Sequence, residues 1–331
     1  QLQTYSLRAD FEALALKAQG YFPGFSGLSG SLEASEKGGK ATLDSQKSSI
    51  DVPSVFPVSL IELDRLSAQA KWKLNKGELH AELTQMTFAS PDAAGSVQGS
   101  YQTSAQGPGI IDLTASLSRA DARAVWRYMP HVVGEGARHW LRDALLSGGA
   151  SEATLALKGN LLDFPFLDKS KGQFLVTVKA HDVALDYGTG WPRIDGISGD
   201  LRFEGNGMIV DARRGSILGA QLSNTRAEIP DFDKPISTLH VNGKAEGPTS
   251  EFLKFIDQSP VAGRIDNFTE DMRATGNGHL DIALVIPLDE AKLGDSTIEG
   301  TYHFTNNEVL IDAALPPVRQ VNGSVQFSGS A

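Results

Sequence analysis

A seven-residue pattern recurs four times along this chain, and the recurrence constrains the fold more than any other feature. The pattern begins at Leu28 (LSGSLEA), Leu66 (LSAQAKW), Ile197 (ISGDLRF) and Val321 (VNGSVQF). A longer unit recurs as well, because residues 113–203 match residues 239–327 in the order of strands, helical segment and turns, at an offset of about 125 residues. Such repeats are typical of arrays whose units bury their apolar faces only against neighbouring units.

The repeat predicts one continuous body instead of separate domains. We expect residues 1–331 to form one continuous fragment of a longer protein, since the chain begins and ends inside its repeats. The approximate repeat units are 1–110, 111–236 and 237–331, of which the last is truncated.

Most of the chain alternates apolar with polar residues over five to nine positions, which is typical of strands with one dry and one wet face. The clearest example places Leu280, Ile282, Leu284 and Ile286 on one side. Extended over the whole chain, the pattern predicts about 20 such strands joined by hairpins.

Helical signals are confined to the short segments 121–129, 135–146 and 251–256. Helices this few cannot cover the apolar side of so many strands, so the sheet must curl over itself, pair with a second sheet or hold something apolar that is not protein. We expect a mainly β fold: an elongated, repetitive antiparallel sheet curled into a groove, or β-taco, with a few short helices. A strand spacing of roughly 4.8 Å gives such a groove a length on the order of 90 Å.

Composition argues against several partners. The net charge of −10, with acidic and basic residues interspersed, provides no basic stripe for nucleic acid. The lack of cysteine in 331 residues fits an oxidising compartment and favours the bacterial periplasm. The best apolar run, at 282–286, is far shorter than a membrane span of about 18 residues.

Motifs for catalysis, cofactors or metals are missing from the sequence. It contains no phosphate-binding loop, no nucleophile elbow and no cluster of its seven histidines at ligand spacing. The acids Asp163, Asp168, Asp182 and Asp186 raise the possibility of a glycosidase pair. The last two have acidic counterparts in the next repeat, which favours a scaffold role. We therefore expect no enzyme activity, no cofactor and no metal site.

Aromatic residues in loops and helices are interpreted as packing residues. The tetrapeptide DFPF at 163–166 is expected to pack its loop and not to contact a ligand. Trp126, Trp140 and Trp191 are interpreted as helix and corner anchors instead of a stacking platform.

Five motifs, in this order, resemble the YhdP family of AsmA-like proteins. They are WRYMPHVVGEGARHWLRDAL from Trp126, the DFPF loop, the strand Gly172-Gln173-Phe174, WPRIDGISGDLRFEGNGM from Trp191 and GPTSEFLKFIDQSP from Gly247. The resemblance extends over residues 63–331 and implies a repeating β-groove body in the periplasm of a Gram-negative bacterium. It further implies a parent protein anchored in the inner membrane by an N-terminal helix outside this chain, and a bridge-like role in phospholipid transport and outer-membrane biogenesis.

Together, the alternation and the resemblance predict a groove that conducts phospholipid between the inner and outer membranes. The implied partners are phospholipid acyl chains and, through regions outside this fragment, the two membranes, while no envelope protein partner is identified. The predicted groove-lining residues are Leu155, Leu157, Phe174, Val176, Val178, Val183, Leu185, Leu201, Phe203, Leu280, Ile282, Leu284, Ile286, Phe304, Val309 and Ile311.

Two other interpretations remain open at this point. One is a structural or chaperone-like periplasmic scaffold whose sheet closes around a dry core and carries no lipid. The other is an enzyme acting on envelope polysaccharide, which requires acids that converge on one exposed face.

Overall fold

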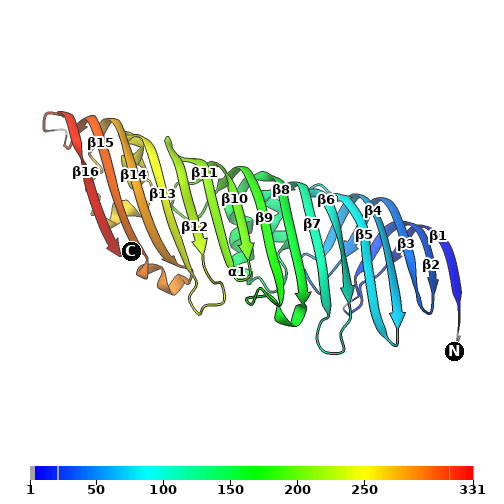
Figure 1. The fold of residues 1–331 in the computed structure, drawn as a ribbon. Helices are drawn as coiled ribbons and strands as arrows, with labels where there is room; N and C mark the ends of the chain where they lie inside the picture. The colour runs from blue at the N-terminus through cyan, green and yellow to red at the C-terminus, as the bar shows by residue number, and fades with distance from the viewer. Residues whose placement is uncertain (1–3, 21, 313, 331) are drawn as a thin grey trace. The chain divides into compact units, whose positions relative to one another are not determined.

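The computed structural model describes residues 4–20, 22–312 and 314–330, and its strands follow one another in chain order through one antiparallel sheet (Figure 1). The sheet is not closed into a barrel, which confirms the predicted mainly β fold. Its first eight strands are β1 (Ser6–Leu16), β2 (Gly24–Ser35), β3 (Gly38–Asp51), β4 (Leu60–Asn75), β5 (Glu78–Ala89), β6 (Ala93–Gln102), β7 (Ile110–Asp121) and β8 (Leu145–Asn160). The others are β9 (Gly172–Leu185), β10 (Ile194–Glu204), β11 (Gly207–Ile217), β12 (Ala220–Ile229), β13 (Thr238–Pro248), β14 (Arg273–Pro287), β15 (Thr297–Leu310) and β16 (Val318–Ser330).

Short helices lie in the connections between strands. They are η1 (Ala122–Tyr128), α1 (Glu135–Ala144), η2 (Leu161–Asp163), α2 (Thr249–Asp257), α3 (Val261–Arg264) and η3 (Glu290–Asp295). The three predicted helical segments are confirmed as η1, α1 and α2, although η1 is a 3-10 helix and α1 ends earlier because Leu145 already begins β8. Over the described residues, no helix has both the length and the apolar character that crossing a membrane requires.

The chain divides into two compact units. Unit 1 comprises residues 1–142, 149–178 and 203–205, and unit 2 comprises residues 143–148, 179–202 and 206–331. The division crosses strands β8, β9 and β10, so each of these strands contributes residues to both units.

The strands are longer and fewer than the sequence pattern predicts. They contain 10 to 16 residues each, and the sheet has 16 of them within the described part of the chain. The prediction of about 20 strands of five to nine residues was wrong because many strands contain a β-bulge, which interrupts the alternation. Thus the apolar runs that start at Phe174 and at Val183 belong to one strand, β9, with Asp182 at a φ of 52° between them.

These bulges are built on residues in the left-handed region of φ, where glycine is favoured but where this chain often has other residues. In unit 1 they include Ala13 on β1 and Lys47 on β3, at φ of 52° and 51°. In unit 2 they include Asn224 on β12 and Asn306 on β15, at φ of 46° and 55°. Register shifts accompany Ala13, Asn224 and Asn306, and a bulge of this kind bends its strand.

Side chains from the next strand hold several bulges in place. The Ala13 N–H donates to Ser29 Oγ at 3.1 Å, and the Asp182 N–H donates to Ser198 Oγ at 3.3 Å. The Asn306 N–H donates in the same way to Asn322 Oδ1 at 2.9 Å. Ser29, Ser198 and Asn322 are each the second residue of the recurring seven-residue pattern, so three of its four copies place a bulge acceptor. We call this arrangement the bulge clamp.

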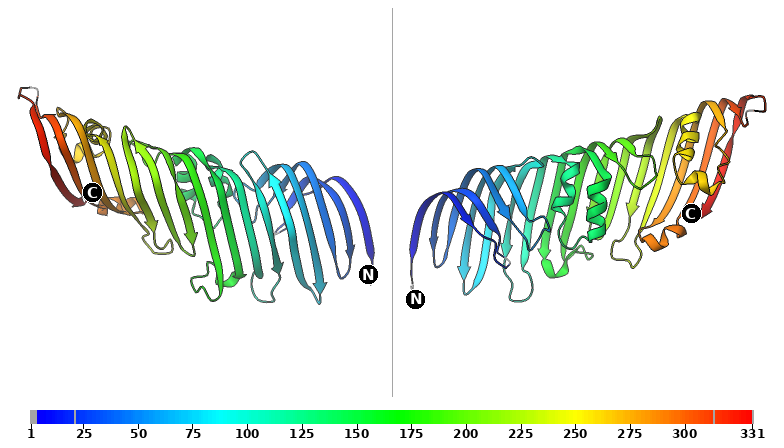
Figure 2. Two further views of the ribbon diagram at one scale, coloured as in Figure 1. Left: turned by 45° about the horizontal axis from the view of Figure 1, so that its top comes forward. Right: turned by 180° about the vertical axis from the view of Figure 1, so that it is seen from behind.

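Because the strands bend, the sheet of each unit has a concave side, which we call the inner face, and a convex outer face (Figure 2). In unit 2, α2 lies on the inner face, where the Phe252 and Tyr302 rings pack with their centroids 4.9 Å apart. Directly paired residues of antiparallel strands project to the same side, so the register assigns each side chain to one face.

Few large side chains are fully buried. Eight of the fourteen buried hydrophobic residues described are alanines, and the larger ones in unit 1 centre on Leu28, Leu63 and Leu66. A sheet with a solid core beneath it would instead bury most of its large apolar side chains. The inner faces are therefore lined by side chains without being filled by them.

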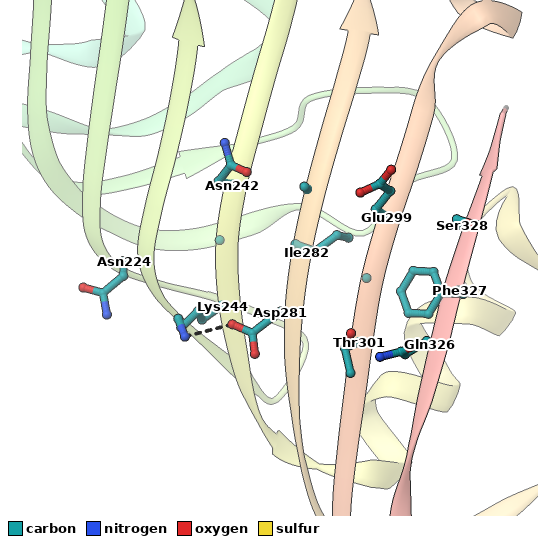
Figure 3. Close-up of a pocket in the computed structure, with 13 residues that line it drawn as sticks. Asn224, Asn242, Lys244, Asp281, Ile282, Glu299, Thr301, Gln326, Phe327 and Ser328 are labelled. Carbon is teal, nitrogen blue, oxygen red and sulfur yellow. Dashed lines mark ion pairs between the residues drawn. The ribbon is translucent and has the colours of Figure 1, made fainter.

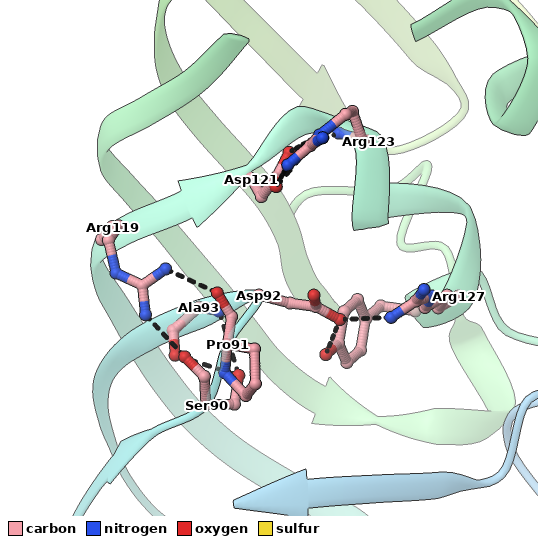
Figure 4. Close-up of polar contacts among 9 residues, drawn as sticks. Ser90, Pro91, Asp92, Ala93, Arg119, Asp121, Arg123 and Arg127 are labelled. Carbon is pink, nitrogen blue, oxygen red and sulfur yellow. Dashed lines mark hydrogen bonds and ion pairs between the residues drawn. The ribbon is translucent and has the colours of Figure 1, made fainter. Parts of the chain in front are cut away.

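A polar cluster fixes η1 at the end of β7 in unit 1 (Figure 4). The Asp92 carboxylate accepts from Arg127 and from the Tyr128 hydroxyl, both at 3.0 Å. Asp121 caps η1 by accepting from the Arg123 N–H at 2.9 Å, and its pKa is lowered chiefly by hydrogen bonds from the Arg123 side chain. These contacts hold η1 against the β5–β6 turn.

The bulge clamp predicts that two serines at the same position of the recurring pattern contribute unequally to the stability of the fold. Ser198→Ala leaves the Asp182 N–H without its acceptor and is expected to lower the free energy of unfolding by about 1 kcal/mol. Ser67→Ala, at an exposed position, is expected to change it by less than about 0.5 kcal/mol. Urea denaturation of both variants measures the difference, and equal effects would contradict the clamp.

Candidate functional site

The inner face of unit 1 presents a continuous apolar row across eight strands. The cross-strand partners from β1 to β8 are Phe11, Gly30, Leu43, Ala68, Met86, Val97, Ala115 and Leu155. No polar side chain interrupts this row. The adjacent pair of Leu113 with Leu157 continues the same apolar surface towards the turns.

Unit 2 has equivalent rows. One passes from β11 to β16 through Gly215, Leu222, Ala245, Leu280, Tyr302 and Val325. The other passes through Val210, Ala227, Val241, Leu284, Ile298 and Gly329. Both rows are apolar except for the Tyr302 hydroxyl, which donates to Thr249 Oγ1 at 2.9 Å.

These apolar side chains remain partly open. Leu280, Ile282, Leu284 and Ile286 are neither buried nor fully exposed, and Val325 on β16 is 52% exposed. An apolar surface of this extent, lined but not filled, is typical of a face that accommodates an apolar ligand.

The outer face of unit 2 has the opposite chemistry (Figure 3). There the rows read Asn242, Ala283, Glu299, Ser328 and Lys244, Asp281, Thr301, Gln326. Together with Asn224, Gly243, Ile282, Gly300 and Phe327, they line a shallow hollow of about 620 Å³. Lys244 and Asp281 form an ion pair at 2.9 Å, and the hydrogen bond from Lys244 lowers the pKa of the Asp281 carboxyl. The charged and amide side chains of these two rows distinguish the outer face from the apolar rows of the inner face.

Glycines on the inner face lie beneath aromatic rings of the neighbouring strand. A Cβ added at Gly300 would lie 2.3 Å from the Phe327 ring, and one at Gly39 would lie 2.5 Å from the Trp72 ring. Each glycine is the direct cross-strand partner of that aromatic residue. The rings therefore lie across the sheet instead of projecting from it, which keeps the inner face shallow.

The predicted groove residues lie on five strands. Leu155 and Leu157 are on β8, Phe174, Val176, Val178, Val183 and Leu185 on β9, and Leu201 and Phe203 on β10; Leu280, Ile282, Leu284 and Ile286 are on β14, and Phe304 and Val309 on β15. The register brings Leu280, Ile282, Leu284, Ile286 and Phe304 onto one surface with Tyr302. Ile311 lies one residue beyond the end of β15 and is 47% exposed.

Sequence reasoning missed the inner face of β1 to β7 altogether. Leu43, Met86 and Val97 belong to the continuous row of unit 1, but glycine or alanine occupies three of the eight places in that row and weakens the apolar signal. The alternation of Ile111, Leu113, Ala115 and Leu117 along β7 was the available sequence signal.

Three of the four acids that raised the glycosidase possibility are engaged by neighbouring side chains. Asp163 pairs with Lys171 at 2.8 Å, and Asp182 pairs with Arg214 at 3.2 Å. Asp168 accepts from the Ser170 hydroxyl, whose hydrogen bond is the main cause of its lowered pKa. His279 and His303, far apart in the sequence, are direct cross-strand partners on the outer face, yet the described residues contain no group of three His, Cys, Asp or Glu suited to a metal ion.

The DFPF loop packs in part as predicted. Phe166 is 3% exposed and lies against the backbones of Gly159 and Gly172, while Phe164 is 42% exposed and packs its ring 5.2 Å from that of Phe174. Trp191 anchors a corner, since its ring lies 6.0 Å from that of Phe255 on α2. Trp140 on α1 is 47% exposed.

Tyr187 belongs to the same aromatic cluster of unit 2 as Trp191, and its raised pKa predicts that the stability of the fold depends on pH. Its ring lies 6.1 Å from that of Trp191, and burial raises its pKa to about 12 from the ordinary value of 10.0. Between these pH values the unfolded chain releases the phenolic proton while the folded chain retains it, so stability falls as pH rises. One such group lowers it by about 1.4 kcal/mol per pH unit in that window.

Tyr187→Phe should therefore flatten the loss of stability between pH 10 and pH 12, but only in part, because burial also raises the pKa of Tyr302 and Tyr128. Urea denaturation at several pH values compares the two proteins. If the free energy of unfolding fell equally with pH in the variant and in the unaltered chain, the raised pKa of Tyr187 would be contradicted.

Comparison with known proteins places this geometry in a family. A model of the YhdP protein family matches residues 1–331. The intermembrane phospholipid transporter YhdP of Escherichia coli (strain K12) is 24% identical over 325 residues, which cover 98% of this chain and 25% of that protein. The chain thus spans about a quarter of the curated relative. No solved structure matches it.

Proposed function

This chain belongs to the YhdP family, and from that membership together with the apolar inner faces we propose that it is a periplasmic segment of a bridge-like lipid transport protein. In this proposal the inner face conducts phospholipid between the inner and outer membranes. The observation that carries it is the uninterrupted apolar register, from Phe11 to Leu155 in unit 1 and from Val210 to Ile298 in unit 2.

The inner face lowers the cost of moving a lipid through water. Exposing one acyl chain of about 16 carbons to water costs roughly 13 kcal/mol at about 0.8 kcal/mol per CH₂. A row of Leu, Ile, Val and Phe side chains lets the acyl chain pass from one apolar contact to the next while the head group stays in water. Because hydrophobic burial is non-directional, the transport requires no single binding residue.

The proposed location is the periplasm. The lack of cysteine fits that compartment. The inner-membrane anchor and both membrane contacts are assigned to parts of the longer family protein, of which this chain corresponds to about a quarter by comparison with the curated relative. The repeat units 1–110, 111–236 and 237–331 are proposed as successive lengths of the same conduit.

Specific observations disfavour the other two interpretations. A closed scaffold would bury Leu284 and Ile286, which remain partly exposed. A polysaccharide-acting enzyme needs two acids facing one substrate, whereas Asp163 and Asp182 are each engaged by a basic residue. We therefore propose a transporter segment without catalytic activity, cofactor or metal.

Two neighbouring residues of β14 provide a matched test of the inner face. Leu284 pairs with Val241 and Ile298 on the inner face, and Val285 pairs with His240 and Thr297 on the outer face. Leu284→Asp is expected to lower the recovery of phospholipid with the purified chain, because a carboxylate interrupts the apolar row of unit 2 while the row of unit 1 stays intact. Val285→Asp is expected to retain it.

Mass spectrometry of lipid extracted from both variants and the unaltered chain measures this difference, with circular dichroism as the check on folding. Equal recovery from the two folded variants would remove the inner face as the lipid path. A second variant with Val178→Asp added to Leu284→Asp tests whether a β9 residue shares it.

A photo-crosslinking amino acid at Val178 is expected to capture phospholipid in cells, whereas the same probe at Thr177 is not. The two positions alternate along β9, and the Thr177 hydroxyl contacts that of Thr154 at 2.6 Å. Lipid adducts are read by mass spectrometry of the purified protein. Capture at Thr177 alone would reverse the assignment of the two faces.

A further inference from the structure

Helix α2 covers only one end of the inner face of unit 2. It begins directly after β13, and its Phe252 ring packs on Tyr302. Tyr302 pairs with Leu280, so α2 lies over the part of β14 and β15 nearest the bulges at Gly276 and Asn306. The rows of Ile282, Leu284 and Ile286 follow towards the other end of β14.

Buried hydrogen bonds and close contacts hold α2 in place on the sheet. Thr249 Oγ1 accepts from the Tyr302 hydroxyl at 2.9 Å and from Asn307 Nδ2 at 2.7 Å. Thr249 and Asn307 are 7% and 1% exposed, so these hydrogen bonds are shielded from water. A Cβ added at Gly219 would lie 2.8 Å from Glu251 Cγ, which shows how closely the helix approaches the β11–β12 turn. Releasing α2 would leave buried polar groups without partners.

At the end of the strands opposite to α2, the connections between strands carry exposed apolar side chains. The connections 230–237 and 288–296 meet there through a hydrogen bond from the Leu288 N–H to the Ser237 carbonyl, at 2.8 Å. They carry exposed apolar side chains, including Ile236 at 39%, Leu288 at 47% and Leu293 at 47%. The same connections carry exposed charges of both signs, Lys234 and Lys292 together with Asp233, Asp289 and Asp295. Apolar side chains beside charges of both signs suit the boundary between acyl chains and a zwitterionic head group, whose phosphate and ammonium groups each find an opposite charge there.

We propose that the inner face of unit 2 is closed to head groups by α2 and open at the edge formed by connections 230–237 and 288–296. A phospholipid then lies with its acyl chains on the rows of Ile282, Leu284 and Ile286 and with its zwitterionic head group at this edge of mixed charge. This inference rests on the proposed function and deepens it, because it assigns the head group to one of the two edges.

Two lysines allow a matched test. Lys254 on α2 and Lys292 on η3 have side chains that are 49% and 50% exposed, and each pairs with an acid three residues away at 3.7 Å. The unaltered chain has no cysteine, so Lys254→Cys, Lys292→Cys and Leu284→Cys each accept one environment-sensitive fluorophore. The probes are two phosphatidylcholines, one with a nitroxide on the head group and one with a nitroxide midway along an acyl chain.

The head-group nitroxide is expected to quench the fluorophore at Lys292→Cys and to leave that at Lys254→Cys unchanged. The acyl-chain nitroxide is expected to quench the fluorophore at Leu284→Cys. Head-group quenching at Lys254→Cys that equals or exceeds quenching at Lys292→Cys, with acyl-chain quenching at Leu284→Cys intact, would overturn the open edge and leave the proposed function standing. Loss of acyl-chain quenching at Leu284→Cys in a folded protein would overturn both.

Discussion

The bend in the strands is the constraint on which the rest of this structure depends. A residue with positive φ stores strain and leaves its N–H out of the regular ladder, so a group that accepts that N–H stabilises the bend. Ser29, Ser198 and Asn322 supply the acceptor from the following strand. The recurring pattern thus does more than mark a period, because its polar residue stabilises the bend of the preceding strand.

The bend separates two surfaces of different chemistry. On the inner face the register aligns apolar residues and glycines from strand to strand, while the outer face carries ion pairs such as Lys244 with Asp281 and Lys71 with Glu82. Exposed pairs of this kind contribute little to stability, typically below about 1 kcal/mol each. Their consequence is solubility of the outer face, and stability must come from the backbone ladder and from small clusters such as Leu28 with Leu66.

The sequence was sufficient for the antiparallel sheet, the apolar face of β14 and the positions of three helices, because alternation and helical spacing are local signals. It was insufficient wherever a bulge intervened, since Asp182 and Asn306 shift the alternation by one residue and make β9 and β15 look like four strands. The cross-strand partners could not be predicted either, because they depend on the register between strands. No local sequence pattern indicates that His279 lies opposite His303 or that Phe11 lies in line with Leu155. The docking of α2 on Tyr302 depends on tertiary contacts across more than fifty residues.

The glycines beneath Trp72 and Phe327 have a kinetic consequence. A ring that projected from the sheet would divide the inner face into compartments, each able to retain an acyl chain for a long residence time. Under the proposed function, rings that lie across glycine put no obstacle in the path of an acyl chain, and a lipid held by many weak contacts leaves each one quickly. A transporter segment of the proposed kind would gain throughput by giving up affinity at every step.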